Sequence, residues 1–208
     1  MGTLVLIEAG KRRVFASALE WPGWCRSGRT EDEALSDLAA YAARYAPVTE
    51  QAGLRLARGA SENFEVLERL TGNATTDFGA PGVAVEYEGR PLDRDDARRL
   101  AALVGACWQY LGSTLATAPA ELRKGPRGGG RDREQIAEHV AEAEIAYARK
   151  LGVRLGHDFV ATRAALIVLL GTPDTEGTPT ETRWPVRYGA RRIAWHVLDH
   201  AWEIEDKS

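Results

Sequence analysis

The sequence RRIAWHVLDHAWEIEDK, residues 191–207, decides our interpretation of the fold. On a helix that advances by about 100° per residue, Ile193 and Val197 fall on one apolar side, and His196 and His200 lie near the edge of that side. Side chains four residues apart have Cβ atoms about 5–6 Å apart, so two such imidazoles can reach one metal ion at about 2 Å. The stretch therefore predicts a core-facing helix that can bind metal, although an isolated pair of this kind is more often hydrogen-bonded packing.

A third histidine occupies the same kind of position on another predicted helix. Residues 132–151 place Ile136 and Val140 on one side of a helix, and His139 lies at the edge of that side. The chain has four histidines, so three of them at the inner edges of two long helices favour a shared site. The fourth, His157, precedes a helix start and is expected to be a capping or loop residue.

Helical periodicity extends through the second half of the chain. Apolar residues at spacings of three and four predict three helices before the last one, over 93–118, 132–151 and 159–170. The third of these is apolar nearly all round and is expected deep in the core. Four successive helices indicate a bundle. Cys107 lies on an apolar stripe, which favours packing over reactivity, and the long segment 171–190 is expected to be a functional loop.

The first 90 residues are richer in β-forming runs. Residues 3–8 and 14–19 predict a hairpin, and Thr30 is expected to cap a helix over 30–46. Three further short strands are expected, at 54–56, 64–66 and 83–87. A small sheet followed by a run of helices makes the expected fold class α+β.

The run from Val14 to Ala42 resembles the HicB-like module. That pattern is a strand, an apolar-Pro-Gly turn, a polar strand ending in Gly-x-Thr, and a helix with an acidic start. The matching residues are Pro22, Gly23, Gly28, Thr30, Glu31, Glu33 and Ala34. The resemblance covers about the first 46 residues and implies a sheet with a helix. These modules are best known from antitoxins, but no DNA-binding pattern follows this one, so an antitoxin-derived regulator is the weakest functional alternative.

The second half of the chain resembles a different family. One histidine within IAEHVAEAE, residues 136–144, combined with H-x3-H in the last helix, is similar to the DinB-like (DinB/YfiT) superfamily of four-helix metalloenzymes. The resemblance implies that His139, His196 and His200 bind a divalent metal and leave open positions for water or substrate. We therefore expect a HicB-like α+β domain with extra strands at 1–90 and a DinB-like four-helix bundle at 91–208.

The composition argues against several functional classes. A net charge of −3 gives no concentrated positive charge for nucleic acid. No run approaches the roughly 20 apolar residues of a membrane span, and the N-terminal basic residues follow the apolar run instead of preceding it, so neither a membrane segment nor a secretory signal is expected. Cys25 and Cys107 form no paired motif. These features favour a cytoplasmic protein.

Carboxylates near the predicted ligands are the candidates for catalysis. Three neutral imidazoles suit zinc or nickel, and the ligand type does not choose between them. Glu142 and Asp199 each follow a predicted ligand by three residues, as does Glu203, which has the best angular placement. Each is a candidate general base, a carboxylate that orients a ligand, or solvated charge. Trp195 and Trp202 lie on the opposite side of the last helix and are expected to pack against the first domain or a partner chain.

The DinB-like fold is similar to thiol-dependent S-transferases, including mycothiol- and bacillithiol-dependent enzymes. This implies a divalent-metal-binding protein in which a low-molecular-weight thiol attacks an electrophile held beneath residues 171–190. The alternative is a non-catalytic ligand-binding or protein-interaction protein built from a HicB-like module and a helical bundle. The partners expected are a small-molecule substrate or thiol and a second copy of the chain in a homodimer, with neither nucleic acid nor a membrane.

Overall fold

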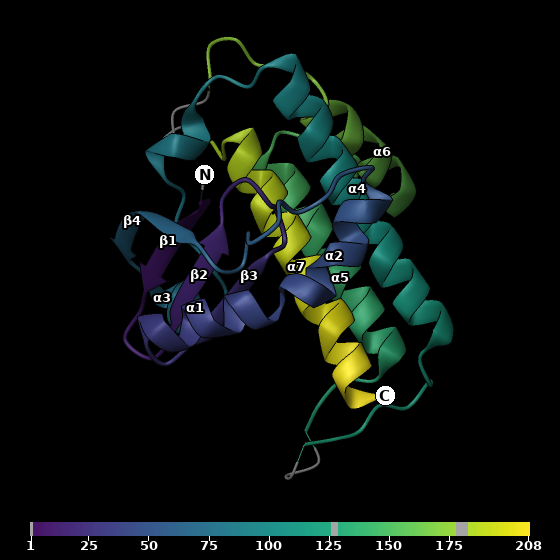
Figure 1. Ribbon diagram of the computed structural model, residues 1–208. Coiled ribbons are helices and arrows are strands. Elements are labelled where there is room, and N and C mark those ends of the chain that lie inside the picture. Colours follow the sequence, from purple (N-terminus) through teal and green to yellow (C-terminus); the bar gives the residue numbers. More distant parts are fainter. Residues whose placement is uncertain (1, 126–128, 178–182) are drawn as a thin grey trace.

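The computed structural model describes residues 2–125, 129–177 and 183–208 and shows an α+β protein, as the sequence predicts (Figure 1). The first part contains β1 (Thr3–Ala9), β2 (Val14–Ala18), β3 (Cys25–Gly28), α1 (Glu31–Ala40), α2 (Ala42–Gln51), β4 (Phe64–Thr71), α3 (Ala74–Phe78) and the 3-10 helix η1 (Glu86–Gly89). The later part contains α4 (Arg94–Thr117), α5 (Arg133–Lys150), α6 (Phe159–Leu170) and α7 (Val186–Lys207).

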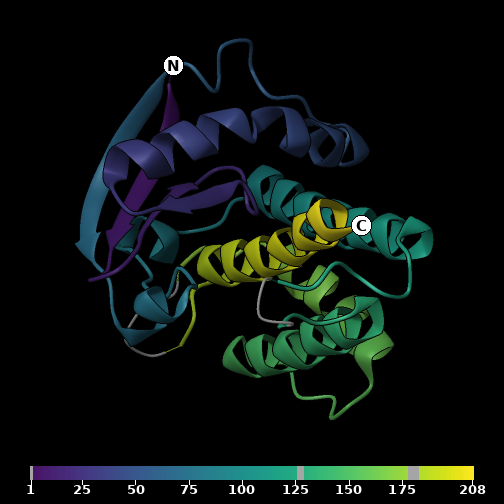
Figure 2. The ribbon, with the colours of Figure 1, turned by 90° about the horizontal axis from the view of Figure 1, so that it is seen from below.

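The strands form one mixed sheet in the order β3-β2-β1-β4. β1 and β2 are antiparallel, with Val5 opposite Ala18, and form the predicted hairpin. β4 runs parallel to β1, which requires the long connection that α1 and α2 provide. α1 covers one face of the sheet, α2 continues beyond the sheet and packs on α4, and the first half of α7 lies toward the other face (Figure 2). The sheet is therefore enclosed between helices near β2 and β3.

β2 is buried on both of its faces. Ala16 belongs to the same hydrophobic cluster as Leu38 of α1. Phe15, on the opposite face, meets Trp195 of α7 edge to face, with 6.1 Å between the ring centroids, and Cys25 joins that contact. An alternating strand exposes one face when only one side is covered, so the continuous burial of β2 reflects helices on both sides.

The turn after β2 fixes the sheet against α7. Gly23 has a φ of 95°, and a Cβ at this position would lie 2.7 Å from Leu198 Cδ1. Glycine is therefore required for the backbone conformation and for the close approach of the two segments. The hydroxyl of Tyr45 donates to the carbonyl of Pro22 at 2.8 Å and holds the same turn to α2.

Three helices, α4, α5 and α6, pack around α7 (Figure 1). Most residues of α7 are buried, so it is the central helix of the molecule. α6 differs from our expectation, because it does not lie deep in the core. Leu166 and Leu170 are fully buried, but Val160 and Val168 are 78% and 69% exposed. α6 has apolar residues nearly all round, but the neighbouring helices cover only the side that carries Leu166 and Leu170.

One of the three extra strands expected after residue 50 forms as predicted. β4 includes the 64–66 run and extends beyond it. The strand expected at 54–56 is wrong. Gly53, with a φ of 72°, turns the chain after α2, and residues 54–56 pair with no strand of the described sheet. Leu56 packs against the core as a single side chain instead.

The strand expected at 83–87 is also wrong. The amide of Val83 donates to Glu8 Oε2 and the amide of Val85 donates to Glu88 Oε2, each at 3.1 Å. Carboxylates thus take up backbone donors that a neighbouring strand would have bound. The β-branched composition of this run predicts a strand, but its hydrogen bonds go to buried side chains.

The helix expected over 30–46 is two helices. Thr30 caps α1 as predicted. The helix then breaks at Tyr41. The indole Nε1 of Trp24 donates to the carbonyl of Leu38 at 2.8 Å, and in a continuous helix the amide four residues later would bind that carbonyl.

The last helix begins at Val186 and not at 191, so the predicted loop 171–190 is shorter than expected. Its residues 178–182 lie outside the described part of the chain. Asp174 forms two backbone hydrogen bonds with Leu92, at 2.7 and 2.9 Å, which hold the described start of the loop to the segment before α4.

A single hydrophobic cluster contains residues from both expected domains. Trp24 and Tyr45 come from the first 90 residues, and Val104 and Ile193 come from the helical part. Trp195 and Trp202 contribute to this contact as predicted, since Trp195 meets Phe15 and the Trp202 ring lies 5.0 Å from that of Tyr41. The boundary between residues 90 and 91 remains a prediction.

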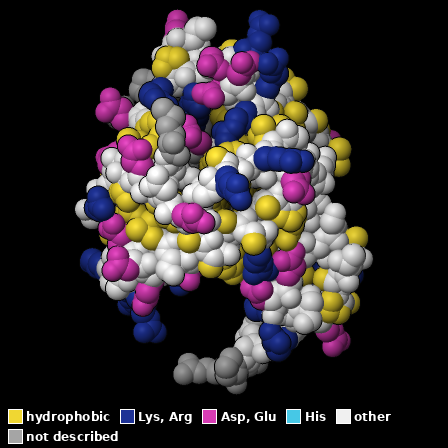
Figure 3. All heavy atoms as spheres, in the orientation of Figure 1, with side chains coloured by type: hydrophobic (Ala, Val, Ile, Leu, Met, Phe, Trp, Pro, Cys, Tyr) yellow, Lys and Arg dark blue, Asp and Glu magenta, His cyan; other side chains and the backbone are white. Residues whose placement is uncertain are grey.

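The described surface carries mixed charge. On the face shown in Figure 3, acidic and basic side chains are interspersed among polar and apolar ones. Such a distribution differs from the concentrated positive surface that binds a phosphate backbone. Within the described ranges, none of the helices has the length and hydropathy to cross a membrane.

Candidate metal centre

His139, His196 and His200 come together between α5 and α7, and one ring nitrogen of each lies within 4.8 Å of those of the other two. The Nε2 atoms of His139 and His196 are 3.3 Å apart. Two nitrogens that each lie about 2.0–2.1 Å from one tetrahedral ion are separated by about 3.3 Å. The spacing of these two ligand atoms therefore fits a shared metal ion.

His200 is oriented by a carboxylate one turn later on the same helix. Its Nδ1 is 2.7 Å from Glu203 Oε2, which leaves Nε2 available to a metal. Glu203 is held in turn by Lys207 Nζ, 2.5 Å from Oε1. These hydrogen bonds, first that of His200, lower the pKa of Glu203 to about 2. A histidine ligand with its second nitrogen bound to a carboxylate is the usual arrangement in metal sites.

Local sequence places His139 on the inner side of α5. Asp132 caps the helix and exchanges hydrogen bonds with Gln135, whose Oε1 accepts the Asp132 amide at 2.9 Å. Ile136 and Val140, on either side of His139 along the helix, are buried. The apolar positions thus press this side of α5 against α7, and the imidazole is carried into the contact.

The same pattern holds on α7. Ile193 and Val197 are completely buried, as the sequence predicts, and His196 and His200 are 6% and 9% exposed. Both imidazoles point into the contact with α5, where their rings lie 5.0 Å from that of His139. The predicted ligand set is thus assembled from two helices that are distant in the sequence.

Burial keeps these imidazoles neutral. Desolvation, followed by the charges of neighbouring histidines, lowers the pKa of His196 to about 2. Desolvation also lowers the pKa of His139. The neutral form is the one that binds metal. His196 Nδ1, the ring nitrogen that does not face His139, is buried and has no hydrogen-bond partner in the described part of the chain.

The other predicted residues lie outside this cluster. Glu142 is exposed on α5 and acts on His139 only through its charge. Asp199 pairs with Arg26 at 3.2 Å and so faces the first part of the chain. His157 is exposed in the turn before α6. Among the acidic candidates, Glu203 is the one that is hydrogen-bonded to a histidine of the cluster.

Sequence reasoning missed three residues beside the cluster. The Tyr147 ring lies 5.7 Å from that of His196, and Trp184 packs on Tyr147 at 5.5 Å. Arg192 Nη2 donates to the Tyr147 hydroxyl at 3.2 Å. The spacing of Arg192, His196 and His200 at four-residue intervals could have placed the arginine on the same side of α7. No sequence pattern indicates Trp184.

A hollow of about 470 Å³ lies beside this group. It is lined mainly by apolar side chains of α6 and of the segments before α6 and α7, with Trp184 on one wall. The described ends of the 171–190 segment contribute Pro173 and Trp184 to its lining. Trp184, on the wall of this hollow, is separated from His196 by the ring of Tyr147.

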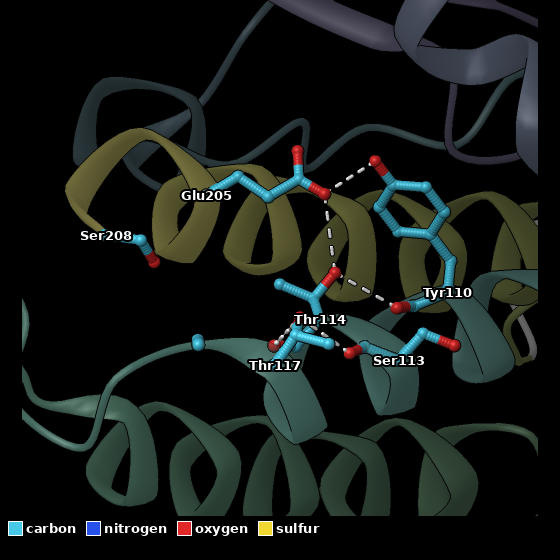
Figure 4. Close-up of a pocket in the computed structure, with 7 residues that line it drawn as sticks. Tyr110, Ser113, Thr114, Thr117, Glu205 and Ser208 are labelled. Atoms are coloured by element: carbon cyan, nitrogen blue, oxygen red, sulfur yellow. Dashed lines mark hydrogen bonds between the residues drawn. The ribbon is translucent and has the colours of Figure 1, made fainter.

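A second hollow, of about 460 Å³, lies at the far end of α7 and contains no predicted site residue (Figure 4). Hydroxyl groups of α4 line it together with Glu205. The carboxylate accepts from Tyr110 at 2.6 Å and from Arg44 at 2.7 Å. The polar groups of Glu205 are thus satisfied by its neighbours, which indicates a structural connection between α2, α4 and α7.

Comparison with protein-family models, with curated proteins and with solved structures finds no match for this chain.

Proposed function

We propose that the protein is a DinB-like, divalent-metal-binding protein that uses its metal to activate a low-molecular-weight thiol for S-transfer. The observation that carries this proposal is the 3.3 Å separation of the His139 and His196 Nε2 atoms, with His200 beside them. We also propose that about the first 46 residues form a HicB-like module, on the basis of their sequence resemblance. Zinc and nickel both suit the nitrogen ligands.

His139, His196 and His200 would hold the ion, and the surrounding residues keep these imidazoles buried and neutral. A divalent metal bound by three imidazoles lowers the pKa of a thiol or water at its open position. His196 and His139 stay neutral through burial and need no deprotonation before binding. The helices around α7 exclude water from the inner side of the cluster.

Glu203 has a positioning role in this proposal. Its carboxylate already accepts from His200 and Lys207, and its pKa of about 2 makes it a poor proton acceptor. It fixes the ring of His200 and directs Nε2 toward the other ligands. The thiol proton would then pass to solvent, and the thiolate would form a bond to the electrophilic carbon while the leaving group departs from that carbon with its bonding electron pair and takes up a proton from solvent.

Metal content tests the ligand assignment. We expect freshly purified protein to contain about one zinc or nickel per chain by elemental analysis, and His200→Ala to lose it. His157→Ala is the matched control, because His157 is exposed and distant from the cluster. Equal metal content in the two variants would contradict the assignment.

A non-catalytic ligand-binding or protein-interaction role is the second candidate. It is favoured by the pairing of Glu203, which leaves the cluster without an available carboxylate base in the described part of the chain. Consumption of a thiol with a model electrophile, measured with metal-loaded protein and with His200→Ala, separates the two. Transfer that depends on His200 supports the enzyme, and metal binding without transfer supports the binding protein.

A further inference from the structure

Arg192 is a buried cation that forms no ion pair with the described residues. It is 5% exposed. Its Nη1 donates to the carbonyl of Pro81 at 2.7 Å and its Nη2 to the hydroxyl of Tyr147 at 3.2 Å, while its Nε is buried without a hydrogen bond to the described chain. A charge removed from water without a countercharge costs free energy. Packing alone does not explain its presence.

The neighbouring Arg191 is also a buried guanidinium on α7, but it has a countercharge. It is 2% exposed, and its Nε and Nη2 donate to the two carboxylate oxygens of Glu88 at 2.6 and 3.0 Å. The positive charge is neutralised by this two-point contact, although Nη1 of Arg191 is buried without a hydrogen bond to the described residues. Arg192, one residue later and almost as deeply buried, has only neutral partners among the described residues, including the faces of the Tyr147 and Trp195 rings at 5.2 and 5.0 Å.

Arg192 lies one helical turn before His196 on the same side of α7. Tyr147 of α5 connects the two, because its ring contacts His196 and its hydroxyl accepts from Arg192. No acceptor for the Tyr147 hydroxyl proton is found among the described residues. The Arg192 Nε–H and the Tyr147 O–H are therefore two unused donors beside the histidines.

We propose that Arg192 and Tyr147 bind the carboxylate of a small acidic ligand whose other end reaches the three histidines. One guanidinium supplies one positive charge, which matches a carboxylate, whereas a phosphate carries up to about two negative charges. One helical turn is about 5.4 Å, a distance that a few covalent bonds span, so the ligand is small. The contact between the ligand's other end and the histidines rests on the proposed function. The contact of its carboxylate with Arg192 and Tyr147 is independent of that function.

The carboxylate could belong to the thiol or to the second substrate. Three probes distinguish these sources: N-acetylcysteine has a thiol and a carboxylate, N-acetylcysteamine has the thiol alone, and succinate has carboxylates without a thiol. Binding of each is measured by calorimetry, with the zinc-loaded protein and with protein stripped by a chelator. The stripped protein tests Arg192 without reliance on the metal.

Arg192→Met and Arg187→Met form the matched pair of variants. Arg187 lies on the same helix but is already paired with Asp96 at 2.7 Å, so its replacement leaves the proposed anion site intact. We expect the unmodified protein and Arg187→Met to bind at least one acidic probe about tenfold or more tightly than Arg192→Met does, the usual effect of a lost hydrogen bond to a charge.

The pattern of binding identifies the source and can overturn the proposal. A preference for N-acetylcysteine over N-acetylcysteamine that disappears in Arg192→Met assigns the carboxylate to the thiol. Binding of succinate that depends on Arg192, without a preference between the thiols, assigns it to the second substrate. Failure of both acids to bind, or binding unchanged by Arg192→Met, overturns the anion site, whatever the metal content proves to be.

Two further variants guard against a general loss of structure. Arg192→Lys keeps the positive charge but loses the planar fork, so we expect intermediate affinity for the acid. Tyr147→Phe removes only one hydroxyl and should weaken acid binding while the protein stays folded, as judged by circular dichroism. Full affinity in both variants would overturn the assignment of these two residues.

Discussion

The two sides of α7 differ in whether the charges on them are paired. On the side toward the sheet, Arg191 pairs with Glu88 and Asp199 pairs with Arg26. On the side toward α5, the row Arg192, His196 and His200 is buried, and it contains a cation with no countercharge and an imidazole nitrogen with no partner among the described residues. One helix thus combines a side with paired charges and a side where we propose that a ligand binds.

The paired charges and the unpaired buried groups are expected to affect the free energy of unfolding in opposite directions. Buried ion pairs whose hydrogen bonds are complete hold a fold in one arrangement, and removal of one member leaves the other charged and unsolvated. Unsatisfied buried groups lower stability, and such groups are concentrated at functional sites in proteins. The three predictions that follow test the two sides against each other.

The largest expected effect comes from Arg191→Met compared with Arg192→Met. Loss of Arg191 leaves the Glu88 carboxylate buried and unpaired, so the free energy of unfolding should fall by about 3–5 kcal/mol. Loss of Arg192 removes an uncompensated charge and should leave stability unchanged or raise it. Urea unfolding followed by circular dichroism measures both. Equal destabilisation by the two substitutions would mean that the two sides do not differ as described.

The next effect concerns the carboxylate that orients a ligand. Glu203→Gln keeps the side-chain shape but removes the negative charge from His200, and metal affinity should fall by about 10–100-fold. Asp199→Asn is the control, since Asp199 pairs with Arg26 on the other side of the helix. Competition with a chromogenic chelator measures both affinities. A similar loss of metal affinity in the two variants would contradict the role of Glu203 in orienting His200.

The smallest effect is a pH dependence of the metal-free protein. His196 takes up a proton near pH 6.5 in the unfolded chain but near pH 2 in the folded protein. Between these values the unfolded state binds more protons, so the free energy of unfolding should decrease as the pH falls below about 6.5, by up to about 1.4 kcal/mol per pH unit. His196→Gln should show a shallower decrease in urea unfolding between pH 7.5 and 4.5. The same slope in both proteins would exclude His196 as the source.

Local patterns in the sequence predicted the four later helices and the inward placement of His139, His196 and His200, because these depend on spacing along one element. The four-residue interval between His196 and His200 and the apolar neighbours of His139 determine which way these rings point. The metal-site interpretation also required the resemblance to DinB-like proteins, since periodicity cannot show that two helices meet. No pattern within a helix could reveal that Tyr147 reaches Arg192.

The errors have a common physical origin in contacts between distant residues. The run at 83–87 has β-forming residues, but Glu8 binds the Val83 amide across the fold. The helix after Thr30 is interrupted where the Trp24 indole binds the Leu38 carbonyl. In each case a side chain from elsewhere takes a backbone group that local structure would have used, and a single sequence carries no signal for that choice.

The partners of Arg191 and Arg192 also limit how freely the helical part could be transplanted. Glu88 and the Pro81 carbonyl both lie within the first 90 residues. In a fragment that starts at residue 91, Arg191 would therefore lack its carboxylate partner, and Arg192 would lack its carbonyl acceptor. Gene fusions or truncations that keep only the helices would thus inherit the histidines but not the setting of the two guanidinium groups. The first 90 residues therefore hold both guanidinium groups in place, and grafting experiments should carry them along.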